Sequence, residues 1–295
     1  MISSFAGSWS RAVRQIGRTA LALCIAGGSA LAVAHDNDRH GSSMLALGDS
    51  VVYGYITADG PAYLNPSNFL GYPEIVGDAL RLDVANASCP GETTSGFLSL
   101  TGDDNGCRTF RANFPLHERY TTTQFDYALA YLGANKRKTK LVTVSLGAND
   151  GFRLLAACKN DPACIQAGLP ATLGMIFANL NTTLSNIRAT GFKGVLMVVN
   201  YFSLDYGDAS QTGLTVALNQ ALAGAAAANS AVVADAFTAF QQAAAPAGGK
   251  TCFAALLNGN PANQTQCDVH PSLSGQRLLA KTVEATYRAV RRGDD

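Results

Sequence analysis

Short apolar segments alternate with longer amphipathic ones, and this alternation restricts the fold more than any other feature. The short segments are rich in β-branched and aliphatic residues, which is typical of buried strands: 44–47, 84–86, 141–146, 195–199 and 231–234. The amphipathic segments have helical spacing: 69–82, 125–132, 171–190, 212–229 and 272–292. Strands that alternate with helices predict an α/β domain, in which a parallel sheet is covered by helices on both faces.

The domain organisation predicted by the sequence is simple. No internal repeat or linker divides the chain, so we expect a single domain over residues 43–295. Three stretches lack a clear period and are expected to be long irregular loops: 98–120, 152–170 and 246–267. Long loops on such a sheet often build the binding site.

The first 34 residues have the features of a secretory signal peptide. Arg11, Arg14 and Arg18 precede an apolar stretch over 20–34, which ends in the small residues of Ala32-Val33-Ala34. The apolar part is about fifteen residues long, short of the roughly 20 that span a bilayer. We therefore expect cleavage after Ala34, a flexible mature N-terminus over 35–42, and a secreted or periplasmic protein. No later apolar run looks long enough to cross a membrane, so stable membrane insertion is not expected.

Cysteine usage agrees with export. Six of the seven cysteines follow the signal peptide, and an even number in an exported chain predicts three disulfides. Six cysteines allow 15 connectivities. Proximity in the sequence favours pairs that each close a local loop: Cys89–Cys107, Cys158–Cys164 and Cys252–Cys267. A metal cluster is disfavoured because the sequence has no CxxC pair.

The charge balance argues against one class of partner. Lys and Arg number 22 and Asp and Glu 21, for a net charge of +1. Such a chain has no surplus of cations to neutralise phosphates, so nucleic-acid binding is not expected. The oligomeric state cannot be inferred from the sequence.

Chemically useful side chains follow the predicted strands. Ser50 comes after the first strand, Gly91 after the second and Asn149 after the third, while Asp268 and His270 precede the last helix. Ligand sites in open α/β sheets lie beyond the carboxyl ends of the strands, so these residues are expected to meet at one edge.

These residue types suit acyl transfer. Ser50 can act as a nucleophile if a base removes its proton, and imidazole is the usual base near neutral pH. Of the four histidines, His35 and His40 lie near the mature N-terminus and His117 in a long loop, which leaves His270. The backbone N–H groups of Ser50 and Gly91 and the amide of Asn149 could stabilise an oxyanion.

The segments Gly48-Asp49-Ser50, Gly91 within Pro-Gly-Glu-Thr-Thr, Gly147-Ala148-Asn149-Asp150 and Asp268-Val269-His270-Pro271 resemble, in order, the sequence blocks of the GDSL/SGNH hydrolases. The resemblance implies a three-layer, flavodoxin-like sandwich with about five parallel strands. It also implies hydrolysis of a small-molecule ester or lipid through a serine acyl-enzyme, without a metal or organic cofactor. Carried over by position, Ser50 is the nucleophile, Gly91 and Asn149 complete the oxyanion hole, and His270 is the base. A G-x-S-x-G elbow, typical of α/β-hydrolases, is absent from the sequence.

One position departs from the family pattern. Many members have the triad acid three residues before the histidine, where this chain has Cys267; Asp268 stands two before it. Either Asp268 or a backbone carbonyl could therefore orient His270. Asp49 and Asp150 are expected to tie loops by hydrogen bonds.

Three questions stay open at this point. The substrate could be a lipid or an O-acetylated carbohydrate. The scaffold could also be a non-catalytic carbohydrate- or lipid-binding module, although such a module has no chemical reason to retain both Ser50 and His270. Four aromatic residues after the nucleophile could line an acyl pocket or pack in the core: Tyr53, Tyr55, Phe69 and Tyr72.

Overall fold

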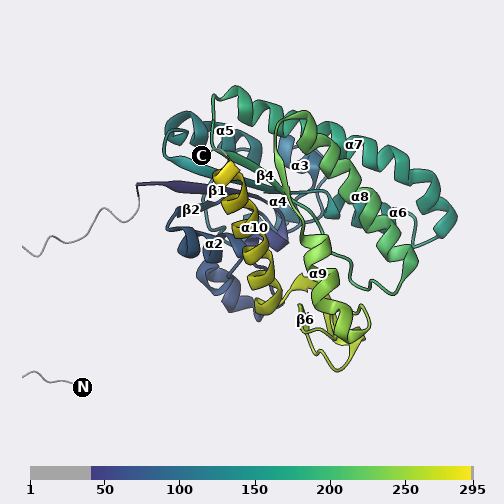
Figure 1. The fold of residues 1–295 in the computed structure, drawn as a ribbon. Helices are drawn as coiled ribbons and strands as arrows, with labels where there is room; N and C mark the ends of the chain where they lie inside the picture. Colours follow the sequence, from purple (N-terminus) through teal and green to yellow (C-terminus); the bar gives the residue numbers. More distant parts are fainter. Residues whose placement is uncertain (1–40, 294–295) are drawn as a thin grey trace, which may run out of the picture. The chain divides into compact units, whose positions relative to one another are not determined.

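The computed structural model describes residues 41–293, which are organised around one five-stranded parallel sheet (Figure 1). The strands lie in the order β2-β1-β3-β4-β5, and every neighbouring pair is parallel. This order is that of flavodoxin-like sheets, which confirms the predicted fold class. The strands are β1 (Ser43–Gly48), β2 (Asp83–Asn86), β3 (Thr139–Ser145), β4 (Val195–Val199) and β5 (Val232–Ala234).

Two groups of helices enclose the sheet. Three helices lie on one face, where α10 packs against the other two: α2 (Tyr72–Leu80), α9 (Ala236–Ala244) and α10 (Leu273–Gly293). A second group packs together on the other: α3 (Thr94–Leu98), α5 (Gln124–Asn135), α7 (Pro162–Ala189) and α8 (Ala209–Ala228). The strands are buried between them; β4, with the sequence Val-Leu-Met-Val-Val, is buried along its whole length. Both faces of the central strands are apolar because both are covered.

Smaller elements extend from the ends of the strands. They include three helices and an antiparallel pair of strands: α1 (Ser50–Tyr53), α4 (Cys107–Asn113), α6 (Ala148–Ala157), β6 (Leu257–Gly259) and β7 (Cys267–Pro271). Four short 3₁₀ helices complete the described elements: Gly60–Leu64, Pro66–Asn68, Ala245–Ala247 and Gln264–Gln266.

The prediction of an irregular loop over 152–170 is wrong. Most of this stretch is helical, in α6 and in the first turns of α7, which includes Pro170. A proline within a helix removes one N–H donor and crowds the carbonyl four residues earlier, yet α7 continues through Pro170. The other two predicted loops also contain short elements, α4 in one and β6 in the other.

Helix α7 contradicts the expectation that no apolar run after the signal peptide looks long enough to cross a membrane. Its 28 residues include a window of mean hydropathy 1.4, so by length and composition it could cross a membrane. In the described part of the chain it instead packs against α3, α5, α6 and α8. Only 11% of that window is buried, so its apolar surface calls for another explanation.

All three predicted disulfides are present, as Cys89–Cys107, Cys158–Cys164 and Cys252–Cys267. Each joins segments that extend beyond the sheet. The expected signal peptide, and most of the expected mature N-terminus, lie outside the described residues.

Candidate active site

Ser50 lies where β1 ends and the short helix α1 begins. Asp49 caps this helix by accepting the Val51 N–H at 2.9 Å. As the first residue of a helix, Ser50 has a backbone N–H without an intrahelical acceptor. Gly48 has a φ of +153°, and a Cβ there would lie 2.4 Å from the Ser145 carbonyl oxygen. The turn that presents Ser50 therefore requires a glycine.

Gln124 holds this turn in place. Its side chain is fully buried, accepts the Gly48 N–H at 2.6 Å and donates to the Gly48 carbonyl at 3.0 Å. Both bonds form with the residue two positions before Ser50, so the buried amide fixes the backbone that carries the hydroxyl.

His270 approaches Ser50 from the other end of the chain. It lies on β7, and its Nε2 is 3.0 Å from Ser50 Oγ. Tyr55 packs on the imidazole, with ring centroids 4.7 Å apart. The structure thus brings the predicted nucleophile and base within proton-transfer distance.

Asp268 lies beside His270 without forming an aligned bond to its ring. Asp268 Oδ2 is 3.3 Å from His270 Nδ1, but the direction is unsuitable for a hydrogen bond. Nδ1 is buried and has no hydrogen-bond partner among the described residues, so a backbone carbonyl does not orient the ring here either. Asp268 Oδ1 accepts the His270 backbone N–H at 2.8 Å, which ties the carboxylate to the same strand.

Asn149 and Gly91 occupy neighbouring segments. Asn149, in the first turn of α6, donates from Nδ2 to the Glu92 carbonyl at 3.0 Å, one residue beyond Gly91. Its Oδ1 accepts from Asn105 Nδ2 at 2.8 Å. Asn105 also donates its backbone N–H to the Gly91 carbonyl at 2.9 Å. Asn105 therefore contacts both of the predicted oxyanion residues that lie outside the Ser50 turn.

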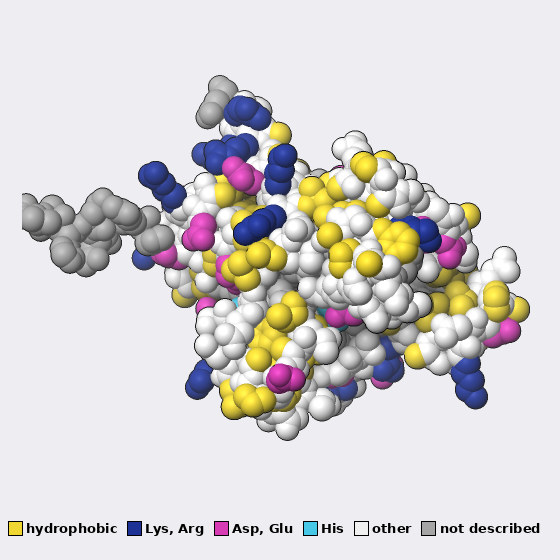
Figure 2. Space-filling model, turned by 90° about the horizontal axis from the view of Figure 1, so that it is seen from below, with side chains coloured by type: hydrophobic (Ala, Val, Ile, Leu, Met, Phe, Trp, Pro, Cys, Tyr) yellow, Lys and Arg dark blue, Asp and Glu magenta, His cyan; other side chains and the backbone are white. Residues whose placement is uncertain are grey.

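A cavity of about 280 Å³ adjoins these residues. Ser50, Asn149 and His270 contribute to its wall, and most of the rest comes from α6, α7 and α8. The aromatic residues Tyr53, Phe69 and Tyr72 are fully buried and lie outside this wall, so they serve as core. Gly91 does not line the cavity either. On the face seen in Figure 2, histidine is visible only as small patches between other side chains.

The sequence profile of the GDSL-like Lipase/Acylhydrolase family matches residues 46–278, most of the chain. The chain belongs to this family. Among curated proteins, none matches it. Phospholipase A1 from Streptomyces albidoflavus NA297 has a similar fold, with a TM-score of 0.57 and 17% identity over 83% of this chain and 98% of that one. A catalytic mutant of an acetylxylan esterase from Geobacillus stearothermophilus also has a similar fold, with a TM-score of 0.51 and 15% identity over 84% of this chain and 94% of that one.

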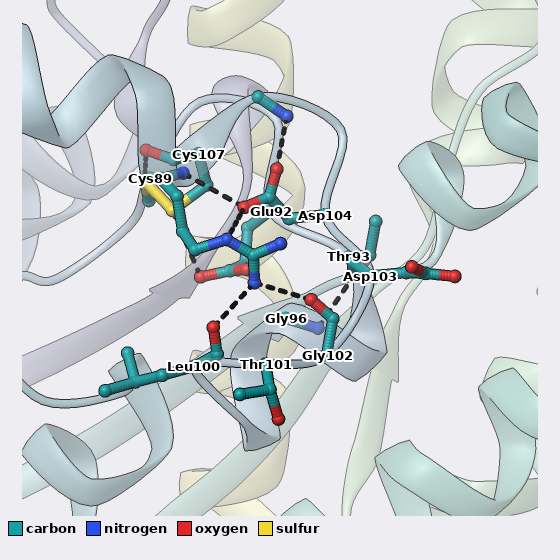
Figure 3. Close-up of polar contacts among 12 residues, drawn as sticks. Cys89, Glu92, Thr93, Gly96, Leu100, Thr101, Gly102, Asp103, Asp104 and Cys107 are labelled. Carbon is teal, nitrogen blue, oxygen red and sulfur yellow. Dashed lines mark hydrogen bonds and ion pairs between the residues drawn. A yellow bond between two sulfur atoms is a disulfide. The ribbon is translucent and has the colours of Figure 1, made fainter.

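Glu92, directly after Gly91, is a buried glutamate in this GDSL hydrolase. Burial raises the pKa of Glu92 to about 8, and the negative charge of Asp104 adds to the effect. Its Oε2 lies 3.4 Å from Gln124 Nε2. The same oxygen lies 3.4 Å from the sulfur of Cys107 (Figure 3). Glu92 thus lies between Gln124, which holds Gly48, and the loop that carries Asn105.

That loop, residues 99–106, is held at several points. Arg108 bridges the carbonyls of Leu100 and Gly102, and its Nε pairs with Asp104 at 2.9 Å (Figure 3). Thr93 donates its hydroxyl to the Asp103 carbonyl. These bonds fix Asn105 relative to Gly91.

Two further carboxylates support the site of the GDSL hydrolase. Asp49 is fully buried and accepts from the Tyr201 hydroxyl at 2.5 Å; burial raises its pKa to about 6. Asp150 accepts both the Thr94 N–H at 2.9 Å and the Thr94 hydroxyl at 2.8 Å. Both aspartates thus join segments, as the sequence predicted. The supporting contacts of Asn105, Gln124 and Tyr201 were not predicted, and no local pattern marks them.

Proposed function

We propose that this GDSL hydrolase cleaves carboxylic esters through a covalent intermediate on Ser50. The observation that carries the proposal is the 3.0 Å distance between Ser50 Oγ and His270 Nε2. At this distance the imidazole can take the hydroxyl proton as Oγ attacks the ester carbonyl carbon. His270 then gives that proton to the leaving alcohol oxygen, which produces an acyl-serine.

Water completes the proposed cycle. His270 takes a proton from water, the resulting hydroxide adds to the acyl carbon, and the proton returns to Ser50 Oγ as the carboxylic acid leaves. In both steps the carbonyl oxygen becomes negatively charged. The N–H groups of Ser50 and Gly91 and the second N–H of the Asn149 amide are the donors proposed to stabilise it.

Asp268 is proposed to stabilise the imidazolium. Its Oδ2 lies 3.3 Å from Nδ1, and its other oxygen is already bonded to the backbone of His270. A small rotation of the carboxylate or of the ring aligns the Nδ1–H with Oδ2 when the ring becomes charged. This matches the role of the acid in a triad, although the residue stands one position later than in many relatives.

The test replaces Ser50 with alanine and measures hydrolysis of p-nitrophenyl esters. We expect kcat to fall at least about 10³-fold, since loss of a nucleophile leaves only the residual catalysis of binding and the oxyanion hole. Ser185→Ala on the exposed surface of α7 is the matched control. A fluorophosphonate should label the wild type and Ser185→Ala but not Ser50→Ala. Equal turnover of Ser50→Ala and wild type would refute the proposal, as would the absence of any labelling.

We also propose that the protein is exported, either secreted or periplasmic. The signal-like sequence of residues 1–34 and the three disulfides support this, because disulfides persist in oxidising compartments. Expression of the full chain, followed by fractionation and N-terminal sequencing, tests it. A mature chain that begins at His35 is expected; an uncleaved chain in the cytoplasm would contradict it.

A further inference from the structure

We infer that the cavity beside Ser50 binds the acyl chain of the substrate, and that it selects fatty acyl groups of medium length. This inference rests on the proposed ester hydrolysis. It adds the chemical class of the substrate and the side of the ester bond that is buried.

The walls of the cavity are the first support. Helix α7 contributes Ile165, Leu169, Leu173 and Ile176, whose spacing of three and four residues places them on one face. Apolar residues of α6 and α8, including Leu155 and Leu218, complete the enclosure. This use of α7 explains why so apolar a helix has little of its surface in the core.

The direction of the cavity follows from the helices that form it. A Cβ on Gly147, at the end of β3, would lie 3.2 Å from the Ile176 side chain and 3.1 Å from that of Leu218. These two residues therefore mark the edge of the sheet, close to Asn149. Ile165 is eleven residues earlier on α7, roughly 16 Å further along its axis. The N-terminal part of α7 thus extends beyond the sheet, and the apolar face extends with it, away from Ser50.

The two threonine hydroxyls in the wall do not donate a hydrogen bond to a ligand. Thr172 donates to the Gly168 carbonyl at 3.1 Å, and Thr215 donates to the Gln211 carbonyl at 3.0 Å. The proton of each threonine hydroxyl is thereby directed to its own helix. A sugar needs several hydrogen bonds from its site, whereas a hydrocarbon needs none, so this wall favours an acyl chain over a carbohydrate.

The volume limits the chain length. An apolar cavity of ~150 Å³ accommodates benzene, with six carbons. In proportion, the 280 Å³ observed here accommodates about eleven carbons. Chains much longer than this would have to leave part of their length in water.

The surroundings of His270 indicate that the leaving alcohol of the ester lies on the solvent side of the ring, away from the cavity. The leaving oxygen must receive its proton from Nε2. Next to the ring, Asp268 is one-third exposed and contacts the exposed Thr57 at 3.4 Å. The alcohol therefore departs toward solvent, and the acyl chain can stay in the cavity until water attacks.

A disulfide holds the cavity walls together. Cys158, just after α6, is bonded to Cys164 in the first turn of α7. The bond fixes the end of one wall to the start of the next, so the site is formed before substrate binds. Such preorganisation lowers the cost of binding.

The first experiment measures kcat/KM for p-nitrophenyl esters from acetate to palmitate. Each methylene that enters the cavity contributes about 0.8 kcal/mol, or roughly fourfold in kcat/KM. We expect kcat/KM to rise up to about eleven carbons and not to rise further beyond that length. A maximum at acetate would overturn the inference, while Ser50-dependent hydrolysis of acetate would leave the proposed function intact. Absence of hydrolysis of every ester would instead refute the proposed function.

The second experiment narrows the cavity. Gly151 lines it, and a Cβ there meets nothing within 4 Å. Gly151→Leu should therefore fill space without strain and lower the octanoate-to-acetate ratio of kcat/KM at least about tenfold. Gly174 on α7 is exposed, outside the cavity and equally free of neighbours, so Gly174→Leu is the matched control and should leave the ratio unchanged. An unchanged ratio in a folded Gly151→Leu would overturn the inference. If that variant does not fold, Leu169→Trp serves the same purpose.

The third experiment compares methyl octanoate with octyl acetate, which differ in the side of the ester bond that carries the chain. We expect preference for methyl octanoate. Preference for octyl acetate would overturn the assignment of the cavity to the acyl side.

Discussion

Replacement of Asn105 should weaken the oxyanion hole although Asn105 does not contact the reacting atoms. The Asn149 amide is held at both ends: its Nδ2 donates to the Glu92 carbonyl at 3.0 Å, and its Oδ1 accepts from Asn105 at 2.8 Å. The second bond determines which end of the amide faces Gly91 and Glu92. Asn105 is therefore a positioning residue for the proposed donor.

The size of the effect differs between two substitutions. Asn105→Ala removes one hydrogen bond of about 1 kcal/mol, so a fivefold loss of kcat is expected. Asn105→Asp places a carboxylate against the Asn149 Oδ1. Either the two oxygens then stay in contact and repel each other, or the Asn149 side-chain amide rotates by half a turn. In the second case Oδ1, which cannot donate, faces the Glu92 carbonyl oxygen. Loss of one oxyanion donor costs about 10²–10³ in kcat, so a loss near 10²-fold is expected for the aspartate.

The assay separates this role from a general effect on folding. We expect kcat for p-nitrophenyl butyrate to fall with little change in KM, and the rate of fluorophosphonate labelling to fall in parallel, because both reactions develop charge on an oxygen. Asn113→Asp is the matched control, since Asn113 is exposed and its side chain, among the residues that the structure describes, bonds only to the Thr109 carbonyl of its own helix. A rise in KM at constant kcat, or equal effects of Asn105→Ala and Asn105→Asp, would refute the reasoning.

Three further predictions concern the same part of the chain. Burial raises the pKa of Glu92 from 4.5 to about 8, so ionisation of Glu92 destabilises the fold as the pH rises between these two values. Glu92→Gln should therefore raise the free energy of unfolding by up to about 5 kcal/mol at pH 9 and change it little at pH 4. Denaturant titrations at each pH measure this difference. Gly91→Ala should lower kcat sharply, since φ is +83° and the added Cβ would lie 2.5 Å from the Asn105 carbonyl oxygen; wild-type kinetics would contradict this. Replacement of Cys252 and Cys267 with serine opens a 15-residue loop and should cost about 3 kcal/mol in denaturant unfolding; no change would contradict it.

The sheet could be predicted because its signal is local. Each of the five strands is a short apolar run bounded by polar or turn residues, and all five predicted runs are strands of the sheet. The 152–170 stretch could not be read in the same way. The stretch lacks a clear helical period, whereas in the structure Asp161 caps α7 and Pro170 is accommodated within it. A helix whose apolar face lines a cavity shows a weaker period than one that packs on a core.

The candidate site divides along similar lines. Ser50, His270 and Asn149 could be predicted because each follows or precedes a recognisable element at the same edge of the sheet. Gln124 and Tyr201 could not, since the first acts on a residue 76 positions away and the second on one 152 away. Nothing in their own neighbourhood of the sequence distinguishes them from ordinary core or surface residues.

The three disulfides follow a common physical logic. The sheet supplies hydrogen bonds only up to the carboxyl ends of its strands, and the functional segments all extend beyond those ends. Cys89–Cys107 secures the loop that carries Asn105, Cys252–Cys267 secures the strand pair that carries His270, and Cys158–Cys164 secures the walls of the cavity. Irregular segments with few buried contacts open locally at low free energy. A disulfide in each of these segments limits local opening near the site, where shifts of an ångström change the rate. Loss of each disulfide should therefore impair a different part of the catalytic cycle: oxyanion stabilisation, proton transfer or acyl-chain selection.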